Sequence, residues 1–316
     1  MKPFSTARSP GDRTDRTWLV AVSASMWGLD GLLRKPLALT LHPSTIVLWE
    51  HLIVVVVVAP FIPAAIRAFR ACRWPSQIAI IGIGVGASAA ATALFTEAFK
   101  LSASSGDFVT PLVLQKLQPV FAVLLAMVLL RERLRPGFGY YAIPALAGAW
   151  LLAFAHPFDI KIAAVKVALF ALAAAALWAS GTVLGRMVSA EVSSRDLTVL
   201  RFVWGLIGAF VINWTLHDPM TPGWSNLKGL VPLALVPGLL ALVLYYAALR
   251  YTAASRATFA ELAFPATAAV VGVAFLDASL TTSQWLGFAV LVAAITGLSW
   301  HERVRKPAVL TPAGAP

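Results

Sequence analysis

The chain has 316 residues, of which 59% are hydrophobic and 12% are charged, and it carries a formal net charge of +11. Together with a mean hydropathy of +0.80, this composition excludes an ordinary soluble domain and a disordered chain. It is typical of a protein with many membrane-spanning helices, each of which needs about 20 mainly apolar residues.

Ten apolar stretches follow a polar tail over residues 1–16. Five contain no Asp, Glu, Lys or Arg and are 19 to 23 residues long, which is enough to span a bilayer. These five are Trp74–Thr96, Pro136–Phe158, Val167–Gly185, Gly229–Leu249 and Ala278–Trp300. Each of the other five carries an ionisable residue: Asp30, Glu50, Lys116, Arg201 and Glu261. A charge inside a bilayer costs at least ~2.5–3.5 kcal/mol on insertion scales, so we expect these side chains to face a protein interior or a wet cavity.

The basic residues fall unevenly on the two sides of a ten-span chain. With a cytoplasmic N-terminus, 17 Lys and Arg lie in inner segments and 6 lie in outer loops, Arg34 and Lys35 among the six. The positive-inside rule then predicts a plasma-membrane protein with both termini in the cytoplasm. The basic surface is expected to face anionic lipid headgroups rather than nucleic acid.

The two halves of the chain repeat each other. Trp27 in MWGLDGLLRKPL aligns with Trp178 in LWASGTVLGRMV, and Lys100 in EAFKLSASSG aligns with Arg250 in AALRYTAASR. Ser44 aligns with Asp196, and each is expected to cap the N-terminus of its helix. These landmarks keep one order along both halves, which indicates an internal repeat.

Each half contains five predicted spans, and an odd number makes the halves enter the membrane from opposite sides. We therefore predict an all-α integral membrane fold with ten transmembrane helices, as two inverted five-helix repeats over 17–158 and 159–300. Residues 1–16 and 301–316 are expected to be cytoplasmic tails. In proteins of this architecture the substrate site lies near the membrane midplane, at the interface between the repeats.

At these repeated landmarks the chain resembles the drug/metabolite transporter superfamily, in particular proteins with two EamA-type repeats. The segments that carry the resemblance are Trp27–Gly28, the Ala/Ser-rich link after Lys100, Pro119–Glu132, Pro265–Asp277 and Trp285–Gly287. The resemblance covers roughly residues 17–300 and implies ten helices and alternating-access movement of small metabolites, commonly outward in bacteria. One departure is that the family often has a basic residue early in the second helix of each repeat. Arg201 fits this pattern, whereas the first repeat has Trp49 and Glu50.

The fourth apolar stretch contains a polar group in the sequence PLVLQKLQP. Gln115 and Gln118 share a helix face, and Lys116 points about 100° away from Gln115. Pro111 and Pro119 remove backbone donors on either side of the group, which frees carbonyl groups for a substrate or water. Lys116 either contacts a substrate carboxylate or extends toward the outer surface.

Glu261 occupies the matching place in the ninth stretch. An acid in apolar surroundings can load and release a proton. Alternatively, Glu261 forms an ion pair with Lys116 or Arg201, or lies at the surface. Trp27 and Trp178 are expected to line the cavity because the repeat places them symmetrically. Tyr246 could offer a ring and a hydroxyl to a substrate, although aromatic residues also anchor helices at the membrane interface.

Four more residues are candidates for proton handling or for ion pairs: Asp30, Glu50, His51 and Arg201. Glu50 and His51 are neighbours, and His is the side chain most easily switched near neutral pH. The pair either handles protons or caps the outer end of its helix. Asp30 lies three residues after Trp27 on the same helix face, near the expected outer end of the span. Arg201 is expected to pair with an acid or a carbonyl.

These patterns favour a secondary transporter that exports a small metabolite, such as an amino acid, with membrane lipids as its surroundings and proton coupling as a hypothesis. An integral-membrane lipid-modifying enzyme and a channel or scramblase are the alternatives. The five His residues show no HExxH spacing and the chain has one Cys, so we expect no metal site. The chain also lacks a P-loop and a GxSxG element, and we expect no cofactor.

Overall fold

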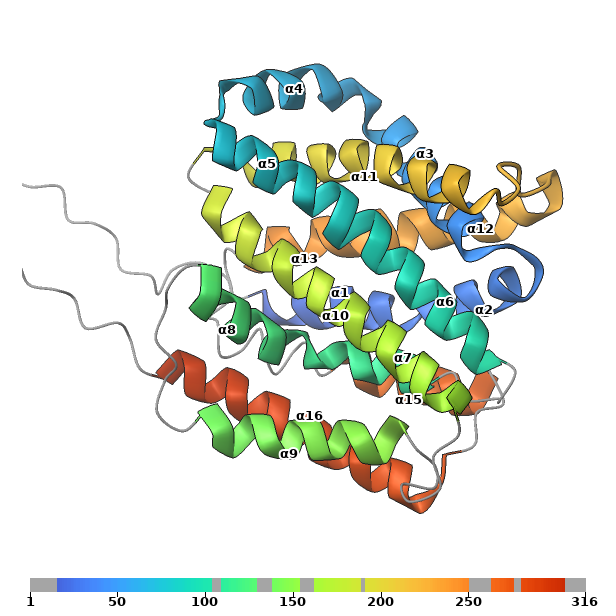
Figure 1. Cartoon of the computed structure of the whole chain (residues 1–316), viewed down its shortest axis with the longest axis vertical. Coiled ribbons are helices and arrows are strands. Elements are labelled where there is room, and N and C mark those ends of the chain that lie inside the picture. The colour runs from blue at the N-terminus through green and yellow to red at the C-terminus, as the bar shows by residue number, and fades with distance from the viewer. Residues whose placement is uncertain are drawn as a thin grey trace, which may run out of the picture.

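The computed structural model describes residues 16–103, 109–129, 138–153, 162–188, 191–249, 263–275 and 280–304. Every regular element within these ranges is helical, as Figure 1 shows. The all-α fold expected from the hydropathy pattern is confirmed for this part of the chain.

The first half of the chain forms helices that run back and forth across the molecule. They are α1 (Thr17–Gly28), α2 (Asp30–Thr40), α3 (Pro43–Val58), η2 (Ala59–Phe61), α4 (Ile62–Ala71), α5 (Trp74–Gly82), η3 (Ile83–Ala90), α6 (Ala91–Ala103), α7 (Val109–Leu114), η4 (Gln115–Leu117), α8 (Gln118–Leu129) and α9 (Phe138–Ala153). The segments η2 and η4 are 3₁₀ turns, and η3 is a π-helix. Leu29 interrupts the first span between α1 and α2.

The second half follows the same order. Its elements are α10 (Ile162–Val188), α11 (Ser194–Leu216), η5 (Trp224–Asn226), α12 (Leu227–Leu233), η6 (Ala234–Leu240), α13 (Ala241–Leu249), α15 (Ala263–Phe275) and α16 (Thr282–Val304). The segment η6 is again a π-helix, and it lies in the third span of its half, as η3 does. In contrast to the first span, α10 runs without interruption.

Five of the described helices are long and apolar enough to cross a membrane. They are Pro43–Ala71, Trp74–Ser102, Ala164–Gly185, Ser194–Leu216 and Trp224–Tyr245. Several of them join shorter elements through 3₁₀ or π segments, which continue the helix with a local change in its hydrogen bonding. The chain is thus a multi-pass membrane protein, and the number of ten passes stays a prediction from the sequence.

Glycines in the third span allow close packing between the two halves. A Cβ atom on Gly84 in η3 would come within 2.9 Å of the Gly205 nitrogen in α11. On the facing helix, a Cβ atom on Gly208 would lie 3.1 Å from the Val85 Cα atom. The GIGVGAS sequence therefore lets two helix backbones approach each other, as small residues commonly do in membrane proteins.

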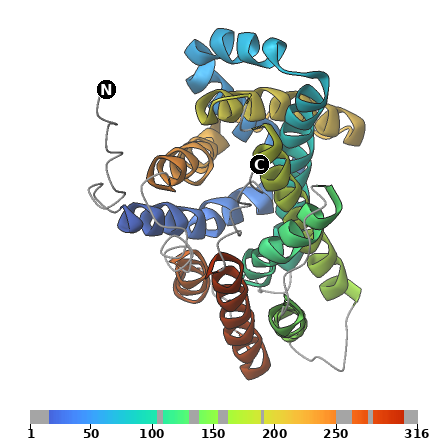
Figure 2. The ribbon, with the colours of Figure 1, turned by 90° about the vertical axis from the view of Figure 1, so that its left-hand side faces the viewer.

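The helices of one half pack on those of the other in an exchanged pattern. The helix α1 packs on α13 and α15, and its counterpart α10 packs on α6 and α8. The helices α3 and α11 pack on each other, and α9 packs on α16 along the lower edge of Figure 1. Figure 2 shows α1 and α2 running through the middle of the molecule, with α4 and α11 above and α16 below. A twofold axis between the repeats produces this kind of exchange.

Loops at opposite ends of the molecule also join the two halves. At one end, Glu191 before α11 accepts hydrogen bonds from the Arg73 nitrogen (3.0 Å), the Arg73 Nη2 atom (2.7 Å) and the Ser76 hydroxyl (2.8 Å). At the other end, Asp218 after α11 contacts His42 Nδ1 at 2.8 Å and accepts a hydrogen bond from Ser44. The loops before α3 and before α11, which are equivalent in the repeat, thus lie at opposite ends.

The expected helix caps at Ser44 and Asp196 were wrong. His42 is the N-cap residue of α3, and the Ser44 hydroxyl donates instead to Asp218 across the loop. For α11 the N-cap is Ser193, whose hydroxyl oxygen accepts the Asp196 N–H at 3.1 Å. Asp196 lies within the first turn, where its negative charge favours the helix dipole.

Candidate functional site

Two pairs of aromatic rings connect the repeats at symmetric positions. Trp27 of α1 meets Tyr245 of α13, with ring centroids 5.2 Å apart and ring planes inclined by 49°. Trp178 of α10 meets Phe95 of α6 at 5.5 Å and 55°. Trp27 and Trp178 are equivalent in the repeat, and the alignment of Lys100 with Arg250 makes Phe95 equivalent to Tyr245. Each pair thus joins one repeat to the other, at the interface where substrate sites of inverted-repeat transporters lie.

A buried arginine forms a polar centre next to one of these pairs. The Arg34 side chain is 3% exposed. Its Nε and Nη2 atoms donate to Asp30 at 2.7 and 2.8 Å, and its Nη2 and Nη1 atoms donate to Glu50 at 2.8 and 3.2 Å. Its Nη1 atom also donates to the Thr96 hydroxyl at 2.7 Å. All five guanidinium N–H bonds therefore have an acceptor.

The residues Asp30, Arg34, Glu50 and Thr96, here called the Arg34 cluster, join α2, α3 and α6. Thr96 donates its own hydroxyl to the Thr92 carbonyl at 2.7 Å. Arg34 also lies over the Phe95 ring, with its Cζ atom 5.6 Å from the ring centroid. One guanidinium thus connects two carboxylates to the aromatic pair of Phe95 and Trp178.

The placement of Arg34 corrects the sequence interpretation, which put this residue in an outer loop. The α2 helix extends to Thr40 and carries Arg34 inside the protein, because two acids and a hydroxyl satisfy its N–H groups. The four-residue spacing of Asp30 and Arg34 places both on one helix face, and it could have indicated the contact.

The second repeat lacks the Arg34 cluster. The residues that align with Asp30, Arg34 and Glu50 are Gly181, Gly185 and Phe202. A Cβ atom on Gly181 would lie 2.5 Å from the Ala87 Cβ atom, so this glycine lets α10 pack closely against η3. The aromatic pairs are therefore shared by both repeats, whereas the three charged residues of the Arg34 cluster have no charged equivalents in the second repeat.

The predicted neighbours Glu50 and His51 belong to different polar groups. His51 is buried, and its Nδ1 atom lies 2.8 Å from the Val47 carbonyl oxygen and its Nε2 atom 2.9 Å from the Ser88 hydroxyl. Because a carbonyl can only accept, Nδ1 carries the proton and Nε2 accepts from Ser88. Neighbouring residues point about 100° apart on a helix, so Glu50 meets Arg34 while His51 faces η3 and α11.

Arg201 contacts the same π-helix as His51. Its Nη2 atom donates to the Ala87 carbonyl at 3.2 Å, and its Nε atom lies 3.4 Å from the Ser88 hydroxyl. The expected pairing with a carbonyl is thus observed, and it links α11 to η3. π-Helices change the i→i−4 pattern of backbone bonding and often occur at functional sites.

The structure describes some of the other predicted residues but not all of them. Gln118 donates to the Thr182 hydroxyl at 3.3 Å and so contacts α10. Gln115 begins the 3₁₀ turn η4. The side chains of Lys116 and Tyr246 lie outside the described part of the structure, and so does all of Glu261.

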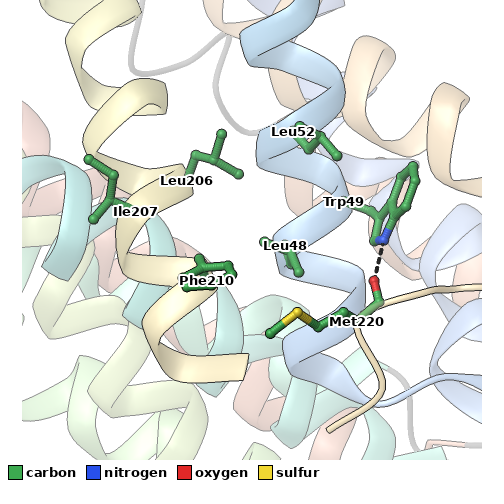
Figure 3. A pocket seen from close by; sticks show the side chains of 7 residues that line it. All are labelled: Leu48, Trp49, Leu52, Leu206, Ile207, Phe210 and Met220. Carbon is green, nitrogen blue, oxygen red and sulfur yellow. Dashed lines mark hydrogen bonds between the residues drawn. The ribbon is translucent and has the colours of Figure 1, made fainter. Parts of the chain in front are cut away.

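A groove of about 410 Å³ lies between α3 and α11, as Figure 3 shows. Apolar side chains line it: Leu48, Trp49, Leu52, Leu206, Ile207, Phe210 and Met220. The Trp49 Nε1 atom donates to the Met220 carbonyl at 2.8 Å. The groove contains none of the charged residues described above, and the candidate site is therefore the aromatic pairs with the Arg34 cluster. In the described ranges, no group of three or more His, Cys, Asp or Glu residues could hold a metal ion.

Comparisons with known proteins agree with this architecture. The model of the EamA-like transporter family matches the chain twice, at residues 17–154 and 165–300. The chain therefore belongs to the EamA-like transporter family, and each match covers one repeat.

Named relatives are also transporters. The chain is 29% identical over 264 residues to the riboflavin transporter ImpX of Fusobacterium nucleatum, an alignment that covers 80% of this chain and 86% of that protein. It is 28% identical over 190 residues to the uncharacterized transporter YwfM of Bacillus subtilis, covering 60% and 64% of the two chains. A structure described as "Crystal structure of protein" has the same fold, with a TM-score of 0.61, 19% identity, and coverage of 93% of this chain and 100% of the other.

Proposed function

We propose that this protein is a secondary transporter that moves a small organic metabolite across the plasma membrane by alternating access. The exchanged packing of the two repeats is the observation that carries the proposal. Two halves that share one interface can expose it to either side in turn by rocking against each other. Both termini lie in the cytoplasm in this proposal, as the distribution of Lys and Arg predicts.

The substrate is a small metabolite that binds at the interface of the repeats. The amino acid expected from the sequence is one candidate. Riboflavin, named for the Fusobacterium relative, is the second and the first to test. The aromatic pairs support it, since flat ring systems stack favourably on tryptophan.

Transport in this proposal is outward and is coupled to protons. The sequence motivates proton coupling through Glu261 and Glu50, and Glu50 lies in the Arg34 cluster. Uphill movement requires a substrate affinity that differs between the two states, or coupling to an ion gradient. Accumulation in vesicles that does not change when a pH gradient is applied would contradict proton coupling.

Counterflow in proteoliposomes tests the proposed function. Vesicles containing the purified full chain are loaded with unlabelled riboflavin or with one member of an amino-acid panel, and uptake of the same labelled solute is followed. A carrier gives saturable uptake that is faster into loaded than into empty vesicles. Flux that rises linearly with concentration and ignores the internal solute would indicate a channel, and the absence of flux for every solute would refute the proposal.

A further inference from the structure

The tryptophans of the two aromatic pairs keep surface that their partners do not cover. Phe95 is only 3% exposed, whereas Trp27, Trp178 and Tyr245 are each partly exposed. Trp27 and Trp178 both pack against one hydrophobic cluster, which includes Phe95, Ala174 and Phe264. Both tryptophans thus border the same cluster, and each keeps indole surface on which a further flat ring can stack.

The carboxylates of the Arg34 cluster can accept further hydrogen bonds, whereas every N–H group of its guanidinium already has an acceptor. Each carboxylate offers about four lone-pair directions. The guanidinium occupies two on Asp30 and two on Glu50, and its own N–H groups are all used. The side chains of Asp30 and Glu50 are 15% and 12% exposed, against 3% for Arg34. The open edge of the cluster thus presents carboxylate oxygens, which accept hydrogen bonds from hydroxyl or N–H groups.

The charge of the cluster selects against anions. Two carboxylates share one guanidinium, so the cluster carries a net charge of about −1 when both acids are ionised. Among the ionisable side chains of α3 and α11, His51 and Arg201 are directed to Ser88 and the Ala87 carbonyl on η3. A phosphate or carboxylate on a ligand would meet like charge in a site of low dielectric, where repulsion is strong.

From these three features we infer that the site takes an uncharged, planar heteroaromatic solute that carries hydroxyl groups. Its ring stacks on Trp27 and Trp178, and its hydroxyls donate to Asp30 and Glu50. The Arg34 guanidinium contacts the Phe95 ring, which packs on Trp178, so the carboxylates and this aromatic pair are neighbours. The inference rests on the proposed transport function and adds a rule of selectivity: phosphorylation of such a solute prevents its binding.

Four ligands test the contributions of the ring, the hydroxyl groups and the phosphate to binding, with the protein left unchanged. Binding to the purified full-length protein is measured by calorimetry for riboflavin, for its phosphate ester FMN, for lumiflavin, which has the ring but no polyol, and for ribitol, which has the polyol but no ring. Riboflavin should bind most tightly. FMN and lumiflavin should each bind roughly tenfold more weakly or worse, and ribitol should not bind. Equal affinity for riboflavin and FMN, or failure of riboflavin to bind, would overturn the inference.

Substitutions then identify the residues that are responsible for this selectivity. Trp27→Ala and Trp178→Ala should each weaken riboflavin binding roughly tenfold, while the phenylalanine variants retain most of the affinity. Trp224, which is 89% exposed on the loop before α12, supplies the control, and Trp224→Ala should bind like the parent. Glu50→Gln keeps an acceptor but removes a charge, so the preference for riboflavin over FMN should shrink. Unchanged selectivity in a folded Glu50→Gln protein would show that the cluster is purely structural.

The counterflow assay separates failure of this inference from failure of the transport proposal. If an amino acid shows counterflow and riboflavin does not bind, transport stands and the ligand class is wrong. If riboflavin binds with the expected selectivity but no solute crosses the vesicle membrane, the ligand class stands and transport is refuted.

Discussion

The two repeats have the same helix order but differently composed interiors. The first repeat places Asp30, Arg34 and Glu50 between α2, α3 and α6. The second repeat has Gly181 and Gly185 on α10 at two of the equivalent positions, and close backbone packing against η3 replaces the ion pairs. Both repeats contribute a tryptophan to a cross-repeat aromatic pair. Aromatic contact is thus shared by the repeats, whereas the ion pairs among Asp30, Arg34 and Glu50 have no counterpart at the equivalent positions of the second repeat.

Because the two halves of the site differ in composition, a bound solute has a preferred orientation. A site with identical halves would bind an asymmetric solute equally well in two orientations. With the carboxylates of the Arg34 cluster on the side of the first repeat, the polar part of a solute is drawn to that side. The same cluster holds the second half of the interrupted first span in place, since Arg34 joins α2 to α3 and α6.

The largest expected effect comes from removing the guanidinium. Arg34→Met leaves two part-buried carboxylates without their counter-ion, and it should destabilise the protein by about 3–5 kcal/mol. The triple variant Asp30→Leu, Arg34→Met, Glu50→Leu should recover much of this loss, because no unpaired charge remains. Unfolding in a mixed detergent series measures both. A stable Arg34→Met protein would mean that the acids do not depend on Arg34.

Substitutions at the glycines of the second repeat test whether α10 packs closely against η3 there. Gly181→Ala puts a methyl group against the Ala87 Cβ atom, 2.5 Å away, and should cost roughly 1–3 kcal/mol through overpacking. Gly185→Ala is the matched control on the same helix. Its nearest contact is the Leu197 Cδ2 atom at 3.9 Å, and it should gain about 0.5–1 kcal/mol from helix propensity. Equal melting temperatures for the two variants would contradict close packing at Gly181.

The aromatic pairs should have similar energies if the repeats are equivalent there. Double-mutant cycles on Trp27 with Tyr245 and on Trp178 with Phe95 should each give a coupling of about 0.5–1.5 kcal/mol. The contact of Arg34 with the Phe95 ring is lost in both Phe95 variants, so it cancels in the second cycle and leaves the two coupling energies comparable. Coupling in one pair and none in the other would break the symmetry proposed for the site.

The smallest effect concerns the loop contact between Arg73 and Glu191. Hydrogen bonds from the Arg73 backbone N–H and guanidinium and from Ser76 lower the pKa of Glu191 from 4.5 to about 2. An acid whose pKa is lower in the folded state stabilises the fold above pH 4.5 and loses that contribution as the pH falls through about 2. Melting temperatures of the parent should therefore fall slightly more than those of Glu191→Gln between pH 5 and pH 3. Parallel curves would show that this contact adds nothing measurable.

The sequence predicts the fold better than the site. Hydropathy and the order of repeated landmarks are enough to predict an all-α membrane fold with two repeats, because both are local properties of the chain. The pairing of Trp27 with Tyr245 depends on which helices meet across the repeats, and the pattern of one span does not contain that information.

Two features of the polar residues could not be predicted from the sequence. Basic residues near the end of an apolar stretch usually lie outside the bilayer, so the sequence alone predicts Arg34 in a loop. Only its acidic partners allow Arg34 to be buried. Adjacent placement of Glu50 and His51 suggested a joint role, although neighbours on a helix face different partners. The π-helices η3 and η6 have no clear signal in the sequence beyond their small residues and Pro237.

The central claim is that the two repeats are inverted relative to each other, and cysteine labelling tests it most directly. Single cysteines replace His42 and Trp224, and separately Arg73 and Arg195, in a Cys72→Ser background. All four positions are more than half exposed in loops or at helix ends. An impermeant thiol reagent added to intact cells should label positions 42 and 224 and leave 73 and 195 unlabelled until the membrane is opened. Positions 42 and 195 lie at the N-terminal ends of α3 and α11, which are equivalent helices of the two repeats. Labelling of both from the same side would show parallel repeats and contradict the account.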